Sequence, residues 1–416
     1  MTKVGAIRLV LLVVLALVVG IQSHFVQSSP SGQNWAIEGG GFCQSTYVAY
    51  NNTVDKLLYA ENCQTGTNDC IAQTDLGALW NNCVRANMPN GGIFGIRAGY
   101  YSVVTSIVLT PNSCPGFANG ICDLGLIWQG SGSGHTNGLT DPAHTNGTIL
   151  VAKTSGMTML KSSTNPVIST GVIVQRVQIR DIAFQGNGLA NTAIDFRMTE
   201  TATLNRFNNL FITNLGGSAA PFTTAIYLDG NEDTTLQDCV FDGAGSSATR
   251  GANVDLQWID TFGNPLIVGT FFGGQTIIVG SNDNVMIRDS TLQAIQIGSS
   301  GGLITLDGGY INGLNNVGQN GGKIVNVGAF SASFQMNGGF YDNLVQGGLS
   351  VPFFGGSGVI LSFGVSHSLW QFGPAANWLT GTVTVTKSVT TGDNHVRGSG
   401  STPTGFPFTV DGNANF

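Results

Sequence analysis

The segment Ile179-Arg180-Asp181-Ile182-Ala183-Phe184 decides the fold, because much of the chain repeats it. Its pattern is an apolar residue, any residue, Asp or Asn, two further residues and a second apolar residue. The pattern returns at residues 207–212, 236–241 and 287–292. Successive central residues are 28, 29 and 51 residues apart, and the last interval is about two repeats: Asp181, Asn209, Asp238 and Asp289. We expect the missing repeat at residues 267–272.

A second set of short apolar segments alternates with the first, mostly about 20 to 32 residues apart: residues 193–196, 225–228, 254–258, 276–279, 303–306, 323–327 and 359–363. Short strands that recur in this way, without helices between them, indicate a solenoid. A single coil cannot bury its own apolar face, so neighbouring coils stack and share one core.

The composition agrees with stacked coils. The chain has 60 Gly among 416 residues and only 9% charged residues, whereas soluble proteins average about 7% Gly and about 25% charged residues. The corner of every coil needs Gly or Asn for backbone positions with positive φ. Like charges stacked at about 4.8 Å repel each other, so Asn, Thr, Ser and Gly replace Lys and Glu. Asp181 and its equivalents are therefore predicted to form a stacked ladder of turns.

The charge balance excludes several classes of protein. There are 16 Lys and Arg against 23 Asp and Glu, and the net charge is −7. An acidic chain of this kind does not suit nucleic acid as a partner. The 42% share of apolar residues argues against disorder.

Residues 1–23 are predicted to be a signal peptide or an N-terminal anchor. Lys3 and Arg8 supply a positive start, and the apolar run at residues 9–21 is shorter than the roughly 20 residues of a spanning helix. The cleavage site is not clear, so both alternatives stay open. No other segment is apolar and long enough to suggest contact with a membrane. The expected location is secreted or at the cell surface.

Seven Cys agree with export. Six lie in the first third of the chain, which suggests up to three disulfides with 15 connectivities: Cys43, Cys63, Cys70, Cys83, Cys114 and Cys122. We favour Cys114 with Cys122, because they flank a loop with Pro and Gly. Cys239 stands in an apolar run and is predicted to be a buried thiol.

A helix is predicted over residues 75–86. Thr74 and Asp75 can cap it, and apolar residues follow at helical spacing: Leu76, Leu79, Trp80, Cys83 and Val84. We predict a cysteine-containing N-terminal cap with this helix over residues 24–92. The parallel coils would then occupy residues 93–381, and a C-terminal β tail or cap residues 382–416.

Between about residues 75 and 243 the chain resembles the pectate-lyase superfamily, in particular its rhamnogalacturonase/epimerase-like and tail-spike-like members. Four motifs carry the resemblance in order after the helix: Gly91-Gly92-Ile93, Arg97-Ala98-Gly99-Tyr100, Leu126-Ile-Trp-Gln-Gly130-Ser-Gly-Ser-Gly134 and Val177-Gln-Ile-Arg-Asp181-Ile-Ala-Phe184. The family's usual Pro before Gly-Tyr is Ala98 here. The resemblance implies an all-β fold, a right-handed parallel β-helix with a short N-terminal capping helix. It implies little about activity, because this fold carries lyases, hydrolases, epimerases and non-catalytic surface proteins.

The catalytic motifs of this superfamily are mostly missing. Polygalacturonases carry Asp-Asp, Gly-His-Gly and Arg-x-Lys, and none of the three is present. Calcium-dependent pectate lyases carry Trp-Ile-Asp-His, in which the Asp helps to hold calcium. The chain has Trp258-Ile259-Asp260-Thr261, which matches three of the four positions. The structural alternative is a buried Trp followed by an Asp in a turn.

The densest acidic cluster could hold calcium. Asp229, Asn231 and Asp233 place oxygen ligands at alternate positions, as at the start of a calcium loop. Thr234 and Val240 stand where an EF-hand needs Gly and a bidentate Glu, so the cluster is no EF-hand. Ca²⁺ is the one cofactor that we expect, and a solvated acidic turn is the alternative.

The alternation of the second set of strands predicts a groove. If Ile194 and Ile226 face the core, Asp195 and Arg197 point outward one coil above Tyr227 and Asp229, and Gln257 or Trp258 follows. Predicted catalytic residues are Asp195, Asp229, Asp260 and Arg197; predicted substrate-binding residues are Tyr227, Trp258 and Arg206. Carboxylates about 5 to 10 Å apart suit hydrolysis, an Arg suits a sugar carboxylate, and a lyase would use Arg197 or Arg206 as its base. The alternative is a set of surface residues with local ion pairs.

Two functions of different classes follow. The favoured one is a secreted polysaccharide-degrading enzyme, either a glycoside hydrolase or a polysaccharide lyase. The alternative is a non-catalytic surface, adhesive or appendage protein that binds glycans or forms a structural layer. After residue 288 the only cations are Lys323, Lys387 and Arg397, which favours a passive stalk for that half. The expected partner is a polysaccharide or cell-surface glycan, and the oligomeric state stays open, with a trimer as one option.

Overall fold

A computed structural model describes residues 45–72, 74–110, 121–133, 147–163, 173–197, 202–213, 215, 223–228, 230–242, 253–261, 263–273, 276–281, 284–312, 323–342, 352–371, 379–392 and 394–397. Three regions lie outside this part: the predicted signal or anchor segment, Cys114 and the last 19 residues. The side chain of Cys122, the partner predicted for Cys114, is not described either. Among the described residues, none of the helices has the length and apolar character needed to cross a bilayer.

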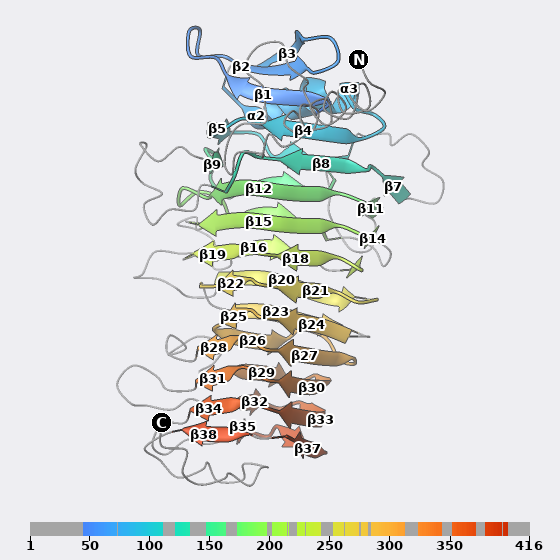
Figure 1. Cartoon of the computed structure of the whole chain (residues 1–416), viewed down its shortest axis with the longest axis vertical. Coiled ribbons are helices and arrows are strands. Elements are labelled where there is room, and N and C mark those ends of the chain that lie inside the picture. The colour runs from blue at the N-terminus through green and yellow to red at the C-terminus, as the bar shows by residue number, and fades with distance from the viewer. Residues whose placement is uncertain are drawn as a thin grey trace, which may run out of the picture.

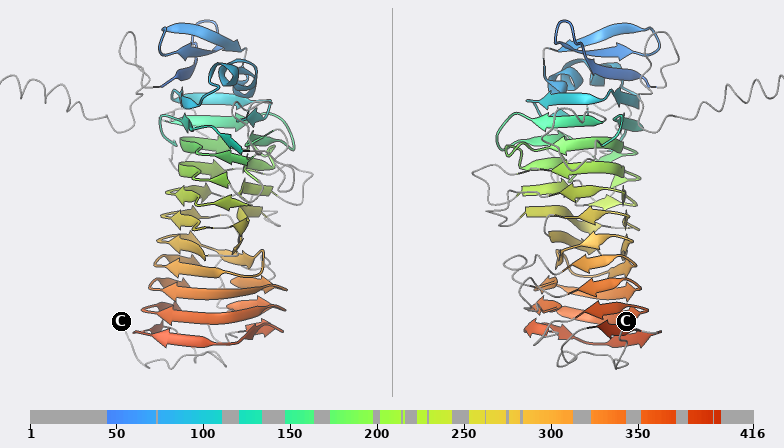
Figure 2. Two further views of the ribbon diagram at one scale, coloured as in Figure 1. Left: turned by 90° about the vertical axis from the view of Figure 1, so that its right-hand side faces the viewer. Right: turned by 60° about the vertical axis from the view of Figure 1, so that its left-hand side comes forward.

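The described chain is a column of stacked coils, with the N-terminal coils at one end and the C-terminal coils at the other (Figure 1). From β4 onward, strands of successive coils pair in parallel in two main sheets, one of 24 strands and one of ten. Figure 2 shows the same single column from two other sides. The predicted all-β fold, a right-handed parallel β-helix with a short N-terminal capping helix, is confirmed.

The 24-stranded sheet is called the long sheet here, and it turns through a bend in each coil. Three strands form its N-terminal end: β1 (Tyr47–Asn51), β2 (Leu58–Asn62) and β3 (Thr67–Ala72). Strands before the bend, or running through it, are β4 (Gly92–Ile96), β8 (Leu126–Gln129), β12 (Gln178–Gln185), β15 (Arg206–Thr213), β18 (Thr235–Gln237), β21 (Leu266–Val268), β24 (Asn284–Arg288), β27 (Leu303–Asp307), β30 (Ser331–Asn337), β33 (Val359–Ser366), β36 (Thr384–Val385) and β37 (Ser388–Thr391). Strands after the bend are β5 (Gly99–Val103), β9 (Thr148–Ala152), β19 (Val240–Asp242), β22 (Phe271–Phe272), β25 (Thr291–Leu292), β28 (Tyr310–Asn312), β31 (Phe340–Asp342), β34 (Leu369–Gln371) and β38 (His395–Arg397).

The ten-stranded sheet closes each coil on its other side. Its strands are β6 (Ile107–Val108), β10 (Thr158–Lys161), β13 (Thr192–Asp195), β16 (Thr223–Tyr227), β20 (Asn253–Thr261), β23 (Thr276–Ser281), β26 (Ala294–Ile297), β29 (Val325–Gly328), β32 (Phe354–Gly356) and β35 (Leu379–Gly381). Two short parallel pairs complete the strands: β7 (Ile121–Asp123) with β11 (Ile173–Gln175), and β14 (Ala202–Thr203) with β17 (Asn231–Glu232). Two segments that the sequence placed in one set with these strands, residues 303–306 and 359–363, lie in the long sheet instead.

The core is built from buried side chains that occupy equivalent positions in successive coils. One row of buried side chains runs down the long sheet in strict register: Trp128, Ile179, Phe207, Leu236, Ile267, Ile287, Leu306, Met336 and Val365. The register confirms that residues 267–272 supply the repeat that the sequence pattern lacked. Each coil buries its apolar row on the coils above and below, which is the source of stability in a solenoid.

The bend of the long sheet is the ladder of turns that the sequence predicted. Its residues have positive φ in coil after coil: Asp181 (61°), Asn209 (49°), Asp238 (52°), Gly269 (60°), Asp289 (47°), Gly308 (71°), Gly338 (65°), His367 (50°) and Gly392 (70°). Asn and Asp tolerate this left-handed conformation better than other residues with a Cβ, and Gly adopts it at no steric cost.

The order of residues along this ladder has a steric reason. A Cβ on Gly269 would lie 2.5 Å from Asp238 Oδ1, and one on Gly308 would lie 2.6 Å from Asp289 Oδ1. The carboxylate of one coil therefore occupies the space of a side chain in the next coil. Asn209 keeps its side chain next to Asp181 because the two form a hydrogen bond: Asn209 Nδ2 donates to Asp181 Oδ1 at 2.7 Å.

The N-terminal end is capped by an antiparallel meander and one helix. β1 pairs antiparallel with β2 and β2 with β3, while β1 also pairs parallel with β4. The predicted helix is present as α2 (Leu76–Leu79), a π-helical turn η1 (Trp80–Val84) and α3 (Arg85–Asn87), and Asp75 Oδ1 caps it by accepting from Gly77 N at 3.0 Å. A Cys70–Cys83 disulfide ties the helix to β3. Cys63 is also disulfide-bonded, and Cys239 is a free buried thiol, as the sequence predicted.

The coils continue beyond the boundary that we expected at residue 381. β36 and β37 pair in parallel with β33, and β38 pairs in parallel with β34. These three strands, Thr384–Val385, Ser388–Thr391 and His395–Arg397, therefore continue the same hydrogen-bonded ladders past residue 381.

Candidate functional site

The outer face of the ten-stranded sheet carries the column that the sequence predicted. Lys161 on β10 pairs in register with Asp195 on β13, Asp195 with Tyr227 on β16, and Tyr227 with Gln257 on β20. Ile194 and Ile226 are buried in the core and also pair in register. The alternation that placed Asp195 and Tyr227 on one outer column is thus correct. Adjacent members are about 4.8 Å apart along the stack.

Asp195 and Arg197 form an ion pair that is anchored on the protein side. Arg197 Nε donates to Asp195 Oδ1 at 3.0 Å, and Arg197 Nη2 donates to Asp195 Oδ2 at 2.7 Å. The Asp195 side chain is 4% exposed, whereas that of Arg197 is 36% exposed. The guanidinium carbon lies 4.6 Å from the centre of the Tyr227 ring, a cation–π contact. Arg197 is therefore held from two sides, and 36% of its side chain stays exposed.

This arrangement does not suit the acid–base role predicted for Asp195. A general acid or base must come within hydrogen-bond reach of the proton that it transfers. Both Asp195 carboxylate oxygens bond to Arg197, and the side chain is almost completely buried. Asp195 instead positions Arg197.

The prediction that Trp258 binds substrate is wrong. Its side chain is 0% exposed and belongs to the core, because alternation along β20 turns position 258 inward when Gln257 faces outward. Its indole Nε1 donates to the backbone oxygen of Asn231 at 3.2 Å. The structural alternative for the Trp-Ile-Asp-Thr segment, a buried Trp, is the correct one.

The predicted calcium ligands do not fit a metal site at Asn231. This side chain is 0% exposed; its Nδ2 donates to the oxygens of Phe196 and Leu228, and its Oδ1 accepts from Asn205. Asp233 is exposed, and its Oδ1 accepts from Asn264 N at 3.1 Å. Within the described ranges, no three His, Cys, Asp or Glu side chains gather closely enough to hold a metal ion.

Of the remaining predicted residues, the structure describes the side chain of Arg206 alone, and Arg206 does not extend the column. Arg206 is exposed, but it begins β15 in the long sheet and so does not share a face with Tyr227. Asp229 and the side chain of Asp260 lie outside the described part of the chain.

Asp255 is a candidate that the sequence reasoning missed. In the pairing of β20 with β16, Asp255 lies two residues before Gln257. Because side chains alternate between the two faces of a strand, Asp255 is expected on the same face as Asp195 and Tyr227. It is 0% exposed and sits where the pairing of β20 with β23 shifts register. Such bulges are frequent next to functional sites. The strand at residues 254–258 was recognised from the sequence, and counting back two residues from Gln257 would have found Asp255.

Comparisons with known proteins add similarity in shape. No protein-family model and no curated protein matches the chain. Among solved structures, it is similar to the A-module of a mannuronan C-5 epimerase from Azotobacter vinelandii, with 12% identity, a TM-score of 0.43 and coverage of 80% of this chain and 96% of the other. A tailspike protein of an Acinetobacter phage is 11% identical with a TM-score of 0.46, and the match covers 82% of this chain and 62% of that one. An endo-xylogalacturonan hydrolase from Aspergillus tubingensis is 12% identical with a TM-score of 0.44, and the match covers 78% of this chain and 92% of that one. At such identities and TM-scores, the similarities carry nothing about what this chain binds or cuts.

Proposed function

We propose that this protein is an extracellular carbohydrate-binding β-helix that holds an acidic polysaccharide on the outer face of β10, β13, β16 and β20. One observation carries the proposal: Arg197 is pinned between the Asp195 carboxylate and the Tyr227 ring, next to the rung of Lys161. Asp195 takes the Nε–Nη2 edge of the guanidinium, so a sugar carboxylate would bind along the Nη1–Nη2 edge, the second planar edge that an Arg offers. Because the guanidinium is already ordered, binding loses little side-chain entropy.

Lys161 supports the same ligand. Its side chain is half-buried, and within the described part of the chain it has no ion-pair partner. It stands one rung from Asp195, about 4.8 Å along the stack. Two cationic side chains on neighbouring rungs match a polymer that carries negative charge along its length. The Cys70–Cys83 disulfide suits a protein that works in an oxidising compartment outside the cell.

Binding of oligogalacturonate, followed by calorimetry, tests the proposal. Lys161→Gln should weaken affinity about 5-fold, and Arg197→Lys about 10-fold, because Lys keeps the charge but loses the fork. Lys153→Gln, which removes an exposed cation after β9, is the matched control and should leave affinity unchanged. Equal affinity in all three variants and the wild type would rule the site out.

Cleavage of the same polysaccharide is a second candidate, with Asp255 at the bulge of β20 as its acid or base. Asp195 takes no part in it, because Arg197 holds both of its carboxylate oxygens. New reducing ends without the ultraviolet absorbance of an unsaturated product would indicate hydrolysis, and both signals together would indicate elimination. Asp255→Asn should abolish either signal. Polysaccharides that stay intact with wild-type protein, with and without calcium, would reject cleavage.

A further inference from the structure

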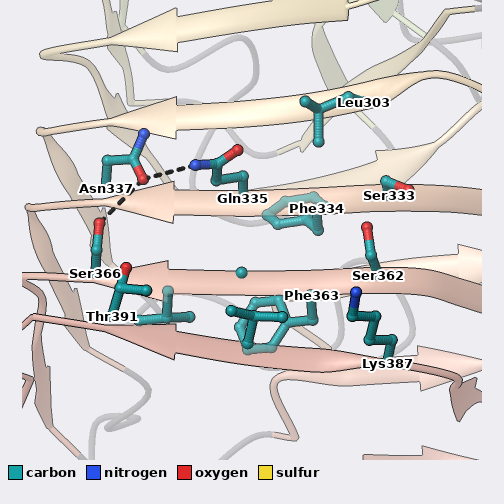
Figure 3. Close-up of a pocket in the computed structure, with 13 residues that line it drawn as sticks. Leu303, Ser333, Phe334, Gln335, Asn337, Ser362, Phe363, Ser366, Lys387 and Thr391 are labelled. Carbon is teal, nitrogen blue, oxygen red and sulfur yellow. Dashed lines mark hydrogen bonds between the residues drawn. The ribbon is translucent and has the colours of Figure 1, made fainter.

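A cleft of about 480 Å³ lies on the outer face of the long sheet, far along the chain from the column just described. Strands β27, β30, β33 and β37 form its floor (Figure 3). The pairing of these strands in register brings three rows of outward-facing side chains next to one another. The central row is Thr305, Gln335, Gly364 and Val389.

Gly364 opens the centre of this cleft without a conformational reason for being Gly. Its φ is not in the positive range that Gly serves elsewhere in the chain. A Cβ there would meet only Gln335 Cγ, at 3.6 Å, an ordinary van der Waals contact. Gly within a strand weakens the strand, and it often marks a place where a ligand or another backbone comes close.

Many of the polar groups that line the cleft are hydroxyls and amides. Ser333, Ser362 and Ser366 contribute hydroxyls, and Asn337 Oδ1 accepts from both Gln335 Nε2 and Ser366 Oγ at 3.1 Å. These two bonds fix the Asn337 amide, whose Nδ2 points away from both donors (Figure 3). Such ordered donors and acceptors suit the hydroxyls of a sugar. Val389, which is 44% exposed, offers an apolar surface for a ring face.

Lys387 gives the cleft its charge. Its amine lies toward Ser362 (Figure 3), and the side chain is exposed. The lining residues include no carboxylate. Past Asn337 and Ser366 the surface continues into a hollow of about 360 Å³ with Asp289, Asp307 and Arg288, which pairs with Asp307. Lys387 is thus the charged group nearest the cleft, and an anionic substituent is attracted to its end.

We propose that this cleft is a second glycan-binding site, which takes a sugar unit over Gly364 with a carboxylate or sulfate substituent directed to Lys387. The site is on a different sheet from the Arg197 column and does not depend on it. Among the described residues, those that line it are neutral apart from Lys387, which suits binding of a sugar.

Calorimetry on the full exported chain tests the proposal with three probes: oligogalacturonate for carboxylate, dextran sulfate oligomers for sulfate, and neutral dextran. Gly364→Val fills the cleft and should reduce affinity for at least one anionic probe more than 10-fold, while the thermal midpoint stays equal or rises. Lys387→Gln should reduce affinity for that probe about 5-fold and leave neutral dextran unchanged. Gln237→Val, an exposed position of the same sheet on β18, is the matched control and should retain wild-type affinity.

Two further measurements keep this site separate from the first. Lys161→Gln alters the column on the ten-stranded sheet, so it should weaken a different binding event from the one that Gly364→Val weakens. Poly-glutamate carries carboxylates without sugar rings and should not compete. Unchanged binding of both anionic probes in Gly364→Val, or competition by poly-glutamate, or a change of oligomeric mass in Gly364→Val, would overturn the proposal.

Discussion

The N-terminal and C-terminal coils use the same scaffold in opposite ways. In the N-terminal coils polar side chains bond to one another: Arg197 pairs with Asp195, and Asn209 donates a hydrogen bond to Asp181. In the C-terminal coils equivalent outer and bend positions hold small residues such as Gly308, and Gly364 leaves a cleft. The difference lies in burial: the Asp195 carboxylate is almost fully buried in its ion pair, whereas the Arg288–Asp307 pair of the C-terminal coils lies at the surface.

The largest effect should come from a core residue of the N-terminal coils. Trp258→Ala removes a fully buried indole and its hydrogen bond to Asn231, so it should lower the free energy of unfolding by about 4 kcal/mol. Phe271→Ala, at an aromatic residue that is 43% exposed, is the control and should lower it by about 1 kcal/mol or less. Denaturant unfolding measures both, and equal effects would mean that Trp258 faces solvent after all.

A buried and an exposed ion pair compare the two regions directly. Asp195→Ala leaves the half-buried Arg197 without its carboxylate, and we expect a loss of about 2 kcal/mol. Asp307→Ala breaks the Arg288–Asp307 pair of the C-terminal coils, where both side chains are more than 40% exposed, and should cost about 0.5 kcal/mol or less. Thermal unfolding of both variants gives the difference, and a reversed order contradicts the comparison.

The bend ladder should show a smaller effect. Asn209→Ala loses the bond to Asp181 and places a Cβ without a polar group at φ 49°, so it should cost about 1.5 kcal/mol. Asn209→Gly loses the same bond but suits the left-handed backbone, and should cost about 1 kcal/mol less than Ala. If Gly proves as destabilising as Ala in denaturant unfolding, the ladder works through its hydrogen bonds alone.

The smallest effect concerns Cys239, which should change nothing until the coils open. Burial raises the pKa of its thiol to about 12, so the thiol stays protonated through neutral and mildly alkaline pH. The reactive thiolate becomes abundant only as the pH approaches that value. Labelling with iodoacetamide at pH 8, followed by peptide mass mapping, should leave Cys239 unmodified in native protein and modify it in denaturant. Fast labelling of native protein would show that the N-terminal coils open easily.

Much of the fold could be predicted because it repeats. The spacing of Asp181, Asn209, Asp238 and Asp289 identified the bend, and register then fixed the core row and the missing coil. The helix at Asp75 followed from its cap and apolar spacing. The candidate site was harder to predict. The alternation of side chains placed Asp195 and Tyr227 in one column, but it could not show that Arg197 forms an ion pair with the Asp195 carboxylate.

The sequence by itself determined the stacked β-helix, because Gly and Asn at regular intervals and alternating apolar residues are local signals that each coil repeats. Only the tertiary structure decided which polar residues can function. The contact between Trp258 and Asn231 and the cleft at Gly364 depend on what lies one coil away, 27 and 29 residues along the chain. Asp195 and Arg197 are only two residues apart, but the ring that holds Arg197 from the other side, Tyr227, comes from the next coil. The C-terminal half looked like a passive stalk because its sequence has few charges, yet its cleft is formed by the missing side chain of Gly364 and by neutral hydroxyls.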